Sequence, residues 1–390
     1  MDYEFSPEDL AFRDEVRTWL RENVPRTPRP VERSAMREFD LAWQRRQYEG
    51  GWAGIAWPVE YGGRGMTLTQ QLIWHEEYAM ANAPDVGANF VGLNHGGPTL
   101  IARANDAQKA FHLPKILRGE AVWCQGFSEP GAGSDLAGLQ THAEIDGDEL
   151  VVTGQKIWTS YADVADYQEL LVRTDRTMGK HKGITWTIVD LTTPGIDIRP
   201  IKTATRDTHF AEVFYDEARI PLDNVVGRLN DGWSVAMSTL GFERGTAFMS
   251  RQVALSRQVE ELIELAREHP GPDGRRMAIA DDEIARQLAD VRAEVAALRA
   301  MTIAVVSRNA RVEQPGPEGS MIKLYFSSVM QHLAKVAMSV LGADGLRFTA
   351  LEEPGGWTGQ YMRSLSASIG GGTSEIQRNI IGERVLGLPR

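Results

Sequence analysis

The feature that most constrains the fold is a change of sequence pattern along the chain, from helical to β-type and back to helical. Between about residue 119 and residue 228, short apolar and β-branched runs follow one another with turn residues between them. The runs cover residues 149–153, 170–172, 184–189, 196–201 and 210–214. Because these runs succeed one another without helices in between, we expect an antiparallel barrel or sandwich rather than a parallel sheet.

Helical sequence lies on both sides of this β-rich region. On the N-terminal side, Ser6 is placed to cap a helix that begins with Pro7. The apolar residues Phe12, Val16 and Leu20 then recur on one face of that helix. On the C-terminal side, helical spacing returns near residue 232, and the long amphipathic stretches cover residues 253–267, 282–311 and 320–341.

The pattern predicts a mainly α protein with a central β domain. We expect an N-terminal helical domain over residues 1–118 and a small antiparallel β-barrel or sandwich over residues 119–228. A C-terminal helical bundle should cover residues 229–390. A chain of 390 residues is too long for one simple core, which agrees with this division into packed units.

Charge and composition exclude several classes of function. The net charge of −11 would repel phosphate backbones, so we expect no nucleic-acid partner. Cys124 is the only cysteine, which rules out a disulfide within the chain and favours a reducing compartment. We expect no membrane span and no secretory signal, and therefore a cytoplasmic protein. His75 has no second histidine four residues away, and we expect no metal site.

A segment of small residues, Phe127–Asp135, stands out in composition. Small residues let a backbone approach a bulky ligand, and exposed N–H and hydroxyl groups can donate hydrogen bonds to it. The segment is not a dinucleotide-binding fingerprint, because Gly131 and Gly133 are not followed by the third glycine. Taken alone, such a run is usually a surface turn.

Two further segments have unusual composition. One is Lys-Ile-Trp-Thr-Ser at residues 156–160, in which Trp158 alone would be read as a core aromatic at the end of a strand. The other is Ile-Gly-Gly-Gly-Thr-Ser-Glu-Ile-Gln-Arg at residues 369–378, which by itself would be a glycine-rich loop near a C-terminus.

In this order and at this spacing, over roughly 250 residues, the three segments resemble those of the acyl-CoA dehydrogenases. The chain length and the helix–β–helix order are similar over essentially the whole sequence. The resemblance implies FAD as cofactor, an acyl-CoA as substrate and a trans-2-enoyl-CoA as product, with hydride transfer to flavin N5. It also implies an electron-transfer flavoprotein as oxidant, a dimer or tetramer that can be heteromeric, and a role in fatty acid metabolism and lipid degradation.

The resemblance also assigns roles to individual residues. The residues that it places along the FAD are Gln125, Phe127, Ser128, Trp158, Thr159, Ser160, Thr373 and Glu375. The residues that it places at the acyl-CoA are Ser134, Arg244, Gly371 and Gly372.

The catalytic base requires a separate argument, because Gly371 stands where many members of this family carry a glutamate. Removal of the weakly acidic α-proton needs a carboxylate in a partly desolvated pocket, where its pKa rises toward the working pH. The segment Phe-Glu-Arg-Gly at residues 242–245 resembles the other place where the family carries its base, as in isovaleryl- and long-chain-type members. We therefore expect Glu243 to be the base and the Gly371 N–H to donate to the thioester carbonyl. A glutamate taken at random would be an exposed helical side chain, and Arg244 would be a surface arginine.

Two departures from the family pattern leave alternatives open. The Arg-x-x-Phe-Gly element that grips FAD in many members is absent at residues 267–272, and the Gln-Ile-Leu-Gly-Gly element appears as Ser-Val-Leu-Gly-Ala at residues 339–343. One alternative is a half-site or non-catalytic subunit of a heteromeric acyl-CoA dehydrogenase. A second alternative is a flavin monooxygenase on the same fold. The length and shape of the acyl group are open as well.

Overall fold

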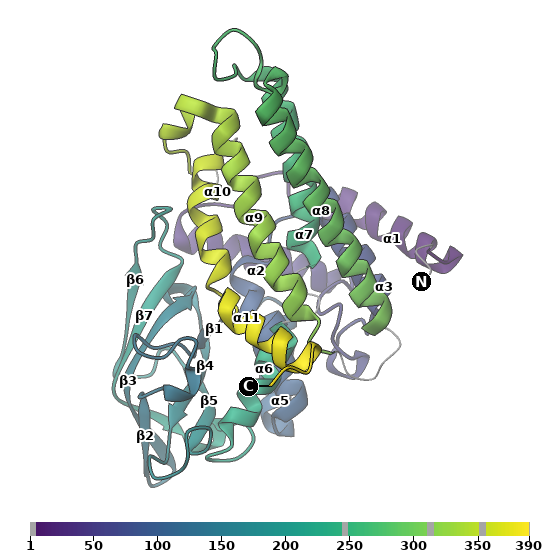
Figure 1. The fold of residues 1–390 in the computed structure, drawn as a ribbon. Helices are drawn as coiled ribbons and strands as arrows, with labels where there is room; N and C mark the ends of the chain where they lie inside the picture. Colours follow the sequence, from purple (N-terminus) through teal and green to yellow (C-terminus); the bar gives the residue numbers. More distant parts are fainter. Residues whose placement is uncertain (1–4, 244–248, 310–315, 351–355, 390) are drawn as a thin grey trace.

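The computed structural model describes residues 5–243, 249–309, 316–350 and 356–389, without the side chains of residues 243 and 249–251. A seven-stranded sheet lies on one side of the molecule (Figure 1). The long helices α8 (Asp282–Asn309) and α9 (Gly319–Leu341) pack together away from it, with the short α10 (Trp357–Ser364) against α9. This is the mainly α architecture with a middle β domain that the sequence pattern predicts.

The first third of the chain is helical. Ser6 caps α1 as predicted, because its side chain accepts a hydrogen bond from the Asp9 N–H while the Asp9 carboxylate accepts one from the Ser6 N–H. Phe12, Val16 and Leu20 are buried on one face of this helix. The five α-helices of this part are α1 (Pro7–Asn23), α2 (Arg33–Glu49), α3 (Leu68–Met80), α4 (Gly97–Arg103) and α5 (Asp106–Leu117), with a π-helical turn at Gly92–Gly96 before α4.

The sheet is mostly antiparallel. Its strands are β1 (Trp123–Gly126), β2 (His142–Asp146), β3 (Glu149–Ser160), β4 (Tyr167–Arg173), β5 (Ile184–Asp190), β6 (Ile196–Ile201) and β7 (Phe210–Pro221). Antiparallel ladders join β2 to β3, β3 to β7, β4 to β5 and β6 to β7. The expectation of antiparallel pairing is confirmed for these, but β1 pairs with β4 in parallel. After β1 the chain forms β2 and β3, and it then returns as β4 beside β1. The two neighbouring strands β1 and β4 therefore run in the same direction.

The last part of the chain is helical again. It comprises α6 (Gly232–Glu243), α7 (Met249–Glu268), α8 (Asp282–Asn309), α9 (Gly319–Leu341), α10 (Trp357–Ser364) and α11 (Ser374–Ile380), with a π-helical turn at Ile381–Val385. The helices α7, α8, α9 and α10 bury one apolar core that includes Leu262, Leu298, Val329 and Trp357. The predicted long helices therefore exist with nearly the predicted bounds.

Candidate functional site

The structure brings two of the three predicted motifs together. The Ile157 N–H, from β3, donates a hydrogen bond of 2.9 Å to the carbonyl of Ser128 in the Gly-rich segment. The buried Lys156 ammonium donates to the Phe127 carbonyl at 3.2 Å and to Glu129 Oε1 at 2.8 Å. Because Lys156 is fully buried, these bonds hold the end of β3 firmly against the start of the Gly-rich segment.

Trp158 lies at an irregular point of β3. The β3–β7 register shifts between Lys156 and Thr159, and Trp158 has a φ of +60°. A left-handed conformation is unusual for a bulky residue, and such outliers gather at functional sites. The bulge turns the indole outward, so that Trp158 is 56% exposed while its neighbour Thr159 is buried. The sequence-only alternative of a core tryptophan is therefore wrong.

The end of β3 fits a flat ligand that accepts or donates hydrogen bonds. The indole of Trp158 offers an exposed aromatic surface, and Phe210 contacts it edge to face with 5.8 Å between ring centroids. The Thr159 Oγ1 is buried and has no hydrogen-bond partner among the described residues. Since buried hydroxyls normally find a partner, the unpartnered Thr159 hydroxyl beside an exposed aromatic surface marks the end of β3 as a candidate binding site. Ser128 and Ser160 lie close by and are half-buried.

Gln125 lies on β1 next to a buried acidic residue. Its Nε2 donates to Glu169 Oε1 at 2.8 Å and is 3.3 Å from His95 Nδ1. Glu169 is fully buried on the neighbouring strand, and His95 comes from the π-helical turn before α4. The amide of Gln125 is therefore engaged within the protein. Neither His95 nor Glu169 was predicted, because neither belongs to a recognisable sequence motif.

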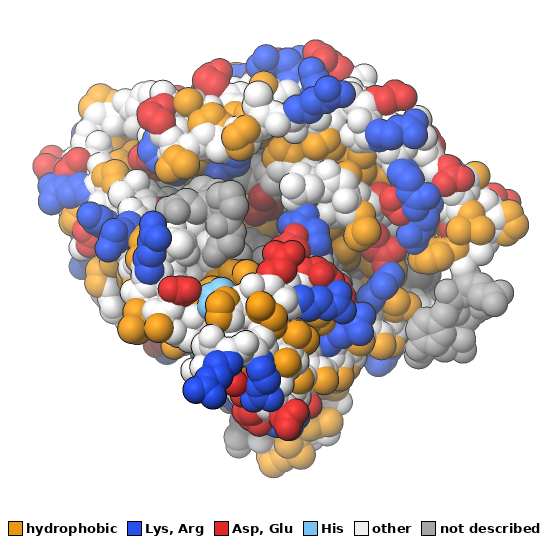
Figure 2. Space-filling view, turned by 90° about the horizontal axis from the view of Figure 1, so that it is seen from above, with side chains coloured by type: hydrophobic (Ala, Val, Ile, Leu, Met, Phe, Trp, Pro, Cys, Tyr) orange, Lys and Arg blue, Asp and Glu red, His pale blue; other side chains and the backbone are white. Residues whose placement is uncertain are grey.

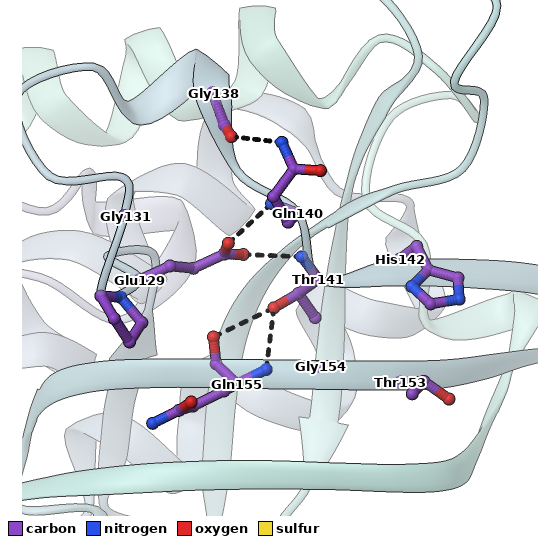
Figure 3. A pocket seen from close by; sticks show the side chains of 10 residues that line it. Glu129, Gly131, Gly138, Gln140, Thr141, His142, Thr153, Gly154 and Gln155 are labelled. Carbon is purple, nitrogen blue, oxygen red and sulfur yellow. Dashed lines mark hydrogen bonds between the residues drawn. The ribbon is translucent and has the colours of Figure 1, made fainter.

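A polar hollow of about 440 Å³ lies beside the Gly-rich segment (Figure 3). The carboxylate of Glu129 points into it and accepts hydrogen bonds from the N–H groups of Gln140 and Thr141, at 2.6 and 2.9 Å. Gly131 reaches this hollow, but none of the predicted cofactor or substrate residues lines it. Because Glu129 also pairs with Lys156, its carboxylate is satisfied and is not a candidate base.

The C-terminal glycine turn forms a second cluster. Gly371 and Gly372 both have positive φ, of 65° and 86°, which only glycine adopts readily in succession. Two buried side chains hold the turn from behind: Gln377 donates to the Gly371 carbonyl at 2.9 Å, and Lys323 donates to the Gly372 carbonyl at 2.6 Å. Thr373 caps α11 by accepting a hydrogen bond from the Ile376 N–H. Glu375 is exposed and lies 3.5 Å from Arg378.

Glu243 is the last residue of α6, and its side chain lies outside the described residues, as does all of Arg244. The helix that carries Glu243 is held at its first residue and at Thr239, one turn before its end. A Cβ at Gly232 would lie 2.3 Å from the Trp186 backbone nitrogen, so only glycine allows α6 to begin this close to β5. Four residues before Glu243, Thr239 is buried with its hydroxyl 2.9 Å from that of Thr99 in α4.

The predicted residues thus fall into separate groups. The segments around Ser128 and Trp158 are joined to each other, whereas the described residues show no hydrogen bond or ring contact between this group and the glycine turn at residues 370–372. Ser134 is exposed at the end of the Gly-rich segment.

On the face that Figure 2 shows, the described residues form no large region that carries charges of only one sign. Acidic and basic side chains are interspersed there, with apolar side chains between them. Among the helices that the structure describes, none is both long and apolar enough to cross a membrane.

Comparison with known proteins identifies the same three parts. The family described as acyl-CoA dehydrogenase, N-terminal domain, matches residues 6–120, the middle domain matches residues 124–218, and the C-terminal domain matches residues 230–386. The acyl-CoA dehydrogenase IpdE1 of Mycobacterium tuberculosis is 41% identical over 387 residues, which cover 97% of each chain.

Two solved structures extend the likeness to the fold. The structure described as Tcur3481-Tcur3483 steroid ACAD has a TM-score of 0.86 at 30% identity and covers 100% of both chains. The ChsE4-ChsE5 complex from Mycobacterium tuberculosis has a TM-score of 0.83 at 32% identity, again over 100% of both chains.

Proposed function

This chain is a member of the acyl-CoA dehydrogenase family, and on that premise we propose that it removes one α-proton and one β-hydride from an acyl-CoA thioester to give a trans-2-enoyl-CoA. Membership makes the chain a flavoprotein oxidoreductase that acts on acyl-CoA and uses FAD. The reaction, the base and the residues that contact the ligands are the parts that we propose.

We propose that the end of β3 and the Gly-rich segment hold the flavin. Trp158 supplies the aromatic surface, and Thr159 and Ser160 supply hydroxyls. Gln125 contributes from β1, and Phe127 and Ser128 contribute from the segment that follows β1. Thr373 and Glu375 approach from the C-terminal cluster. The observation that carries this proposal is the outward-turned Trp158 beside the buried, unpartnered hydroxyl of Thr159. Bound FAD supplies the acceptor for the β-hydride.

The chain must also take the α-proton and polarise the thioester carbonyl. We propose that Glu243, at the C-terminal end of α6, takes the proton, since Gly371 offers no carboxylate. The N–H groups of Gly371 and Gly372 have no acceptor among the described residues, which supports their donation to the thioester oxygen as negative charge develops. Ser134 and Arg244 complete the proposed contacts with the substrate.

We propose a polycyclic or branched acyl group and a second, different subunit. One of the two solved structures is described as a steroid ACAD and the other as a complex, and each description names two components. This chain departs from the family at the two elements that hold the adenine end of FAD. A partner subunit would supply the missing contacts with that end of the cofactor. An electron-transfer flavoprotein is the proposed oxidant.

The first prediction tests the reaction and its base. The flavin-loaded protein, with any partner that co-purifies, should lose its visible flavin absorbance when an acyl-CoA is added under anaerobic conditions. Glu243→Gln should lower the rate of this bleaching by about 10²-fold or more, because the α-proton has no base, while flavin content stays unchanged. Glu264→Gln, on an exposed face of α7, is the matched control and should react like the unsubstituted protein.

Three outcomes would contradict parts of the proposal. Full activity of Glu243→Gln would remove Glu243 as the base. A complex with a co-expressed partner that is bleached by an acyl-CoA at the same rate whether this chain carries Glu243 or Glu243→Gln would favour the non-catalytic-subunit alternative. Oxygen consumption that depends on reduced flavin, without bleaching by any acyl-CoA, would favour the monooxygenase alternative.

A further inference from the structure

Two buried polar side chains converge on the back of the glycine turn. Lys323, on α9, is only 3% exposed, and its ammonium donates to the carbonyls of Gly372 at 2.6 Å and Ala367 at 3.1 Å. Gln377, on α11, is fully buried, and its Nε2 donates to the carbonyl of Gly371 at 2.9 Å. Ser327, one turn after Lys323, donates to the Ala367 carbonyl as well, at 2.7 Å.

These bonds orient the turn peptide by peptide. The peptide group between Gly371 and Gly372 is held through its carbonyl by Gln377, and the next one is held through its carbonyl by Lys323. On the other side, the Gly370 N–H donates to the Ser366 carbonyl at 3.0 Å. The peptide group that carries the Gly371 N–H therefore lies between neighbours that are fixed on both sides.

The result is a polar asymmetry across the turn. Its carbonyls face inward onto Lys323 and Gln377, while the N–H groups of Gly371 and Gly372 have no acceptor among the described residues. A donor bonded to a carbonyl also polarises the N–H of the same peptide group, because hydrogen bonds in a chain strengthen one another. Gln377 therefore makes the Gly372 N–H a stronger donor.

We propose that Lys323 and Gln377 are positioning residues, which hold the glycine turn so that its free N–H groups face and polarise the thioester carbonyl of the substrate. This inference rests on the proposed function and deepens it. Two glycines with positive φ have more conformational freedom than any other pair of residues, so the turn needs external bonds to keep one geometry. Fixed donors in place before the reaction are what an oxyanion-stabilising site requires.

A purely structural role for Lys323 would give different measurements. Burying an ammonium is costly unless its hydrogens are bonded, so loss of the side chain should affect stability in either case. Only the positioning role predicts that loss of the Lys323 side chain changes the polarisation of the carbonyl of a bound thioester. The decisive readout is therefore the carbonyl stretching frequency of a bound thioester, measured by infrared difference spectroscopy.

The experiment uses pivaloyl-CoA labelled with ¹³C at the thioester carbonyl. Because its α-carbon carries no hydrogen, this thioester binds without reacting. In the unsubstituted, flavin-loaded protein the carbonyl band should shift to lower frequency than in water. Lys323→Met and Gln377→Met should each lose most of that shift and lower kcat for a reactive acyl-CoA by about 10- to 100-fold with little change in KM. Lys335→Met, on an exposed face of the same helix, is the matched control.

The outcomes separate this inference from the proposed function. If Lys323→Met and Gln377→Met keep the carbonyl frequency of the unsubstituted protein and lose only thermal stability, the positioning role is overturned and the proposed reaction stands. If no acyl-CoA reduces the flavin of the unsubstituted protein, the proposed reaction fails, and the pivaloyl-CoA band still decides whether the turn polarises a thioester.

Discussion

At the scale of single residues, Trp158 departs most clearly from the backbone conformation that its residue type prefers. A non-glycine residue in the left-handed region costs about 1–2 kcal/mol. The indole recovers little of this through burial, since Trp158 is 56% exposed. The surrounding β3–β7 pairing and the Lys156 hydrogen bonds impose the conformation. This conformation, which lowers stability and exposes an aromatic surface, supports the proposal that Trp158 contacts the flavin.

Replacing Trp158 with glycine should therefore separate stability from cofactor retention. In Trp158→Gly the backbone strain disappears, and the free energy of unfolding of the flavin-free protein should stay within about 1 kcal/mol of the original value. The flavin bound per chain should fall, because the aromatic surface is gone. Trp158→Ala keeps the Cβ in the left-handed region and should be less stable than Trp158→Gly at equal flavin loss. Full flavin retention in both variants would contradict the binding role.

At the scale of elements, the join between β3 and the Gly-rich segment depends on one buried ion pair. Burial lowers the pKa of Lys156 to about 8, against the opposing pull of Glu129. Burial also raises the pKa of Glu129, but the Lys156 ammonium and the N–H donors outweigh it, so that this pKa ends below its usual value. The bonded carboxylate therefore helps to hold the end of β3 and the Gly-rich segment together as long as it is ionised.

The lowered pKa of Glu129 determines how the stability of the protein should depend on pH. A carboxyl whose pKa is lowered by folding stabilises the protein at pH values above the pKa of that carboxyl in the unfolded chain, about 4.5. This contribution is lost as the pH falls through the pKa of the carboxyl in the folded protein. In Glu129→Gln that acid-dependent loss should disappear from the unfolding curve. At pH 7 the variant should lose about 3 kcal/mol, because Lys156 stays buried without its carboxylate.

A surface pair on the same sheet provides the control. Asp197→Asn, beside Arg199 on β6, should change the unfolding free energy by less than about 1 kcal/mol at any pH, since both partners are exposed. Equal losses in the two variants would show that the buried pair does not hold the segments together. Denaturant titrations between pH 3 and pH 7 provide the measurement.

At the scale of the whole molecule, the first and last helical parts are joined through buried carboxylates on α3. Glu76 is 5% exposed and pairs with Arg13 of α1 at 2.9 Å and with Arg299 of α8 at 2.8 Å. Its neighbour Glu77 pairs with Arg13 and Arg17 of α1. Helices from the first and last helical parts thus share one charge network, which holds α1, α3 and α8 together.

Removing the central charge should loosen this arrangement. Glu76→Gln leaves Arg13 partly buried without full compensation, and the free energy of unfolding should fall by about 3 kcal/mol. Calorimetry or denaturant titration measures the loss. Glu264→Gln, which breaks an exposed pair with Arg267, should cost less than about 1 kcal/mol and serves as the control. A loss no larger than that of the control would show that the network does not join the two parts.

Some elements were missed because their local sequence is ambiguous. The strand β2 was not predicted, since Glu144 and Asp146 interrupt its apolar pattern and Ile145 is exposed. The parallel pairing of β1 with β4 was not predicted, because it depends on strands that lie between them in the sequence. The bulge at Trp158 was not predicted either, because it results from the register with β7.

The sequence by itself determined what depends on near neighbours along the chain: the cap at Ser6, the buried face of α1, the long C-terminal helices, the run of strands and the motifs that identify the family. These features arise from interactions over a few residues, whose spacing repeats with the period of a helix or a strand. Only the tertiary structure decided that Lys156 anchors the Gly-rich segment, that Trp158 turns outward, and that Lys323 reaches the glycine turn from a helix about 50 residues earlier. Such contacts form only when distant segments pack together, and no local pattern in the sequence encodes them.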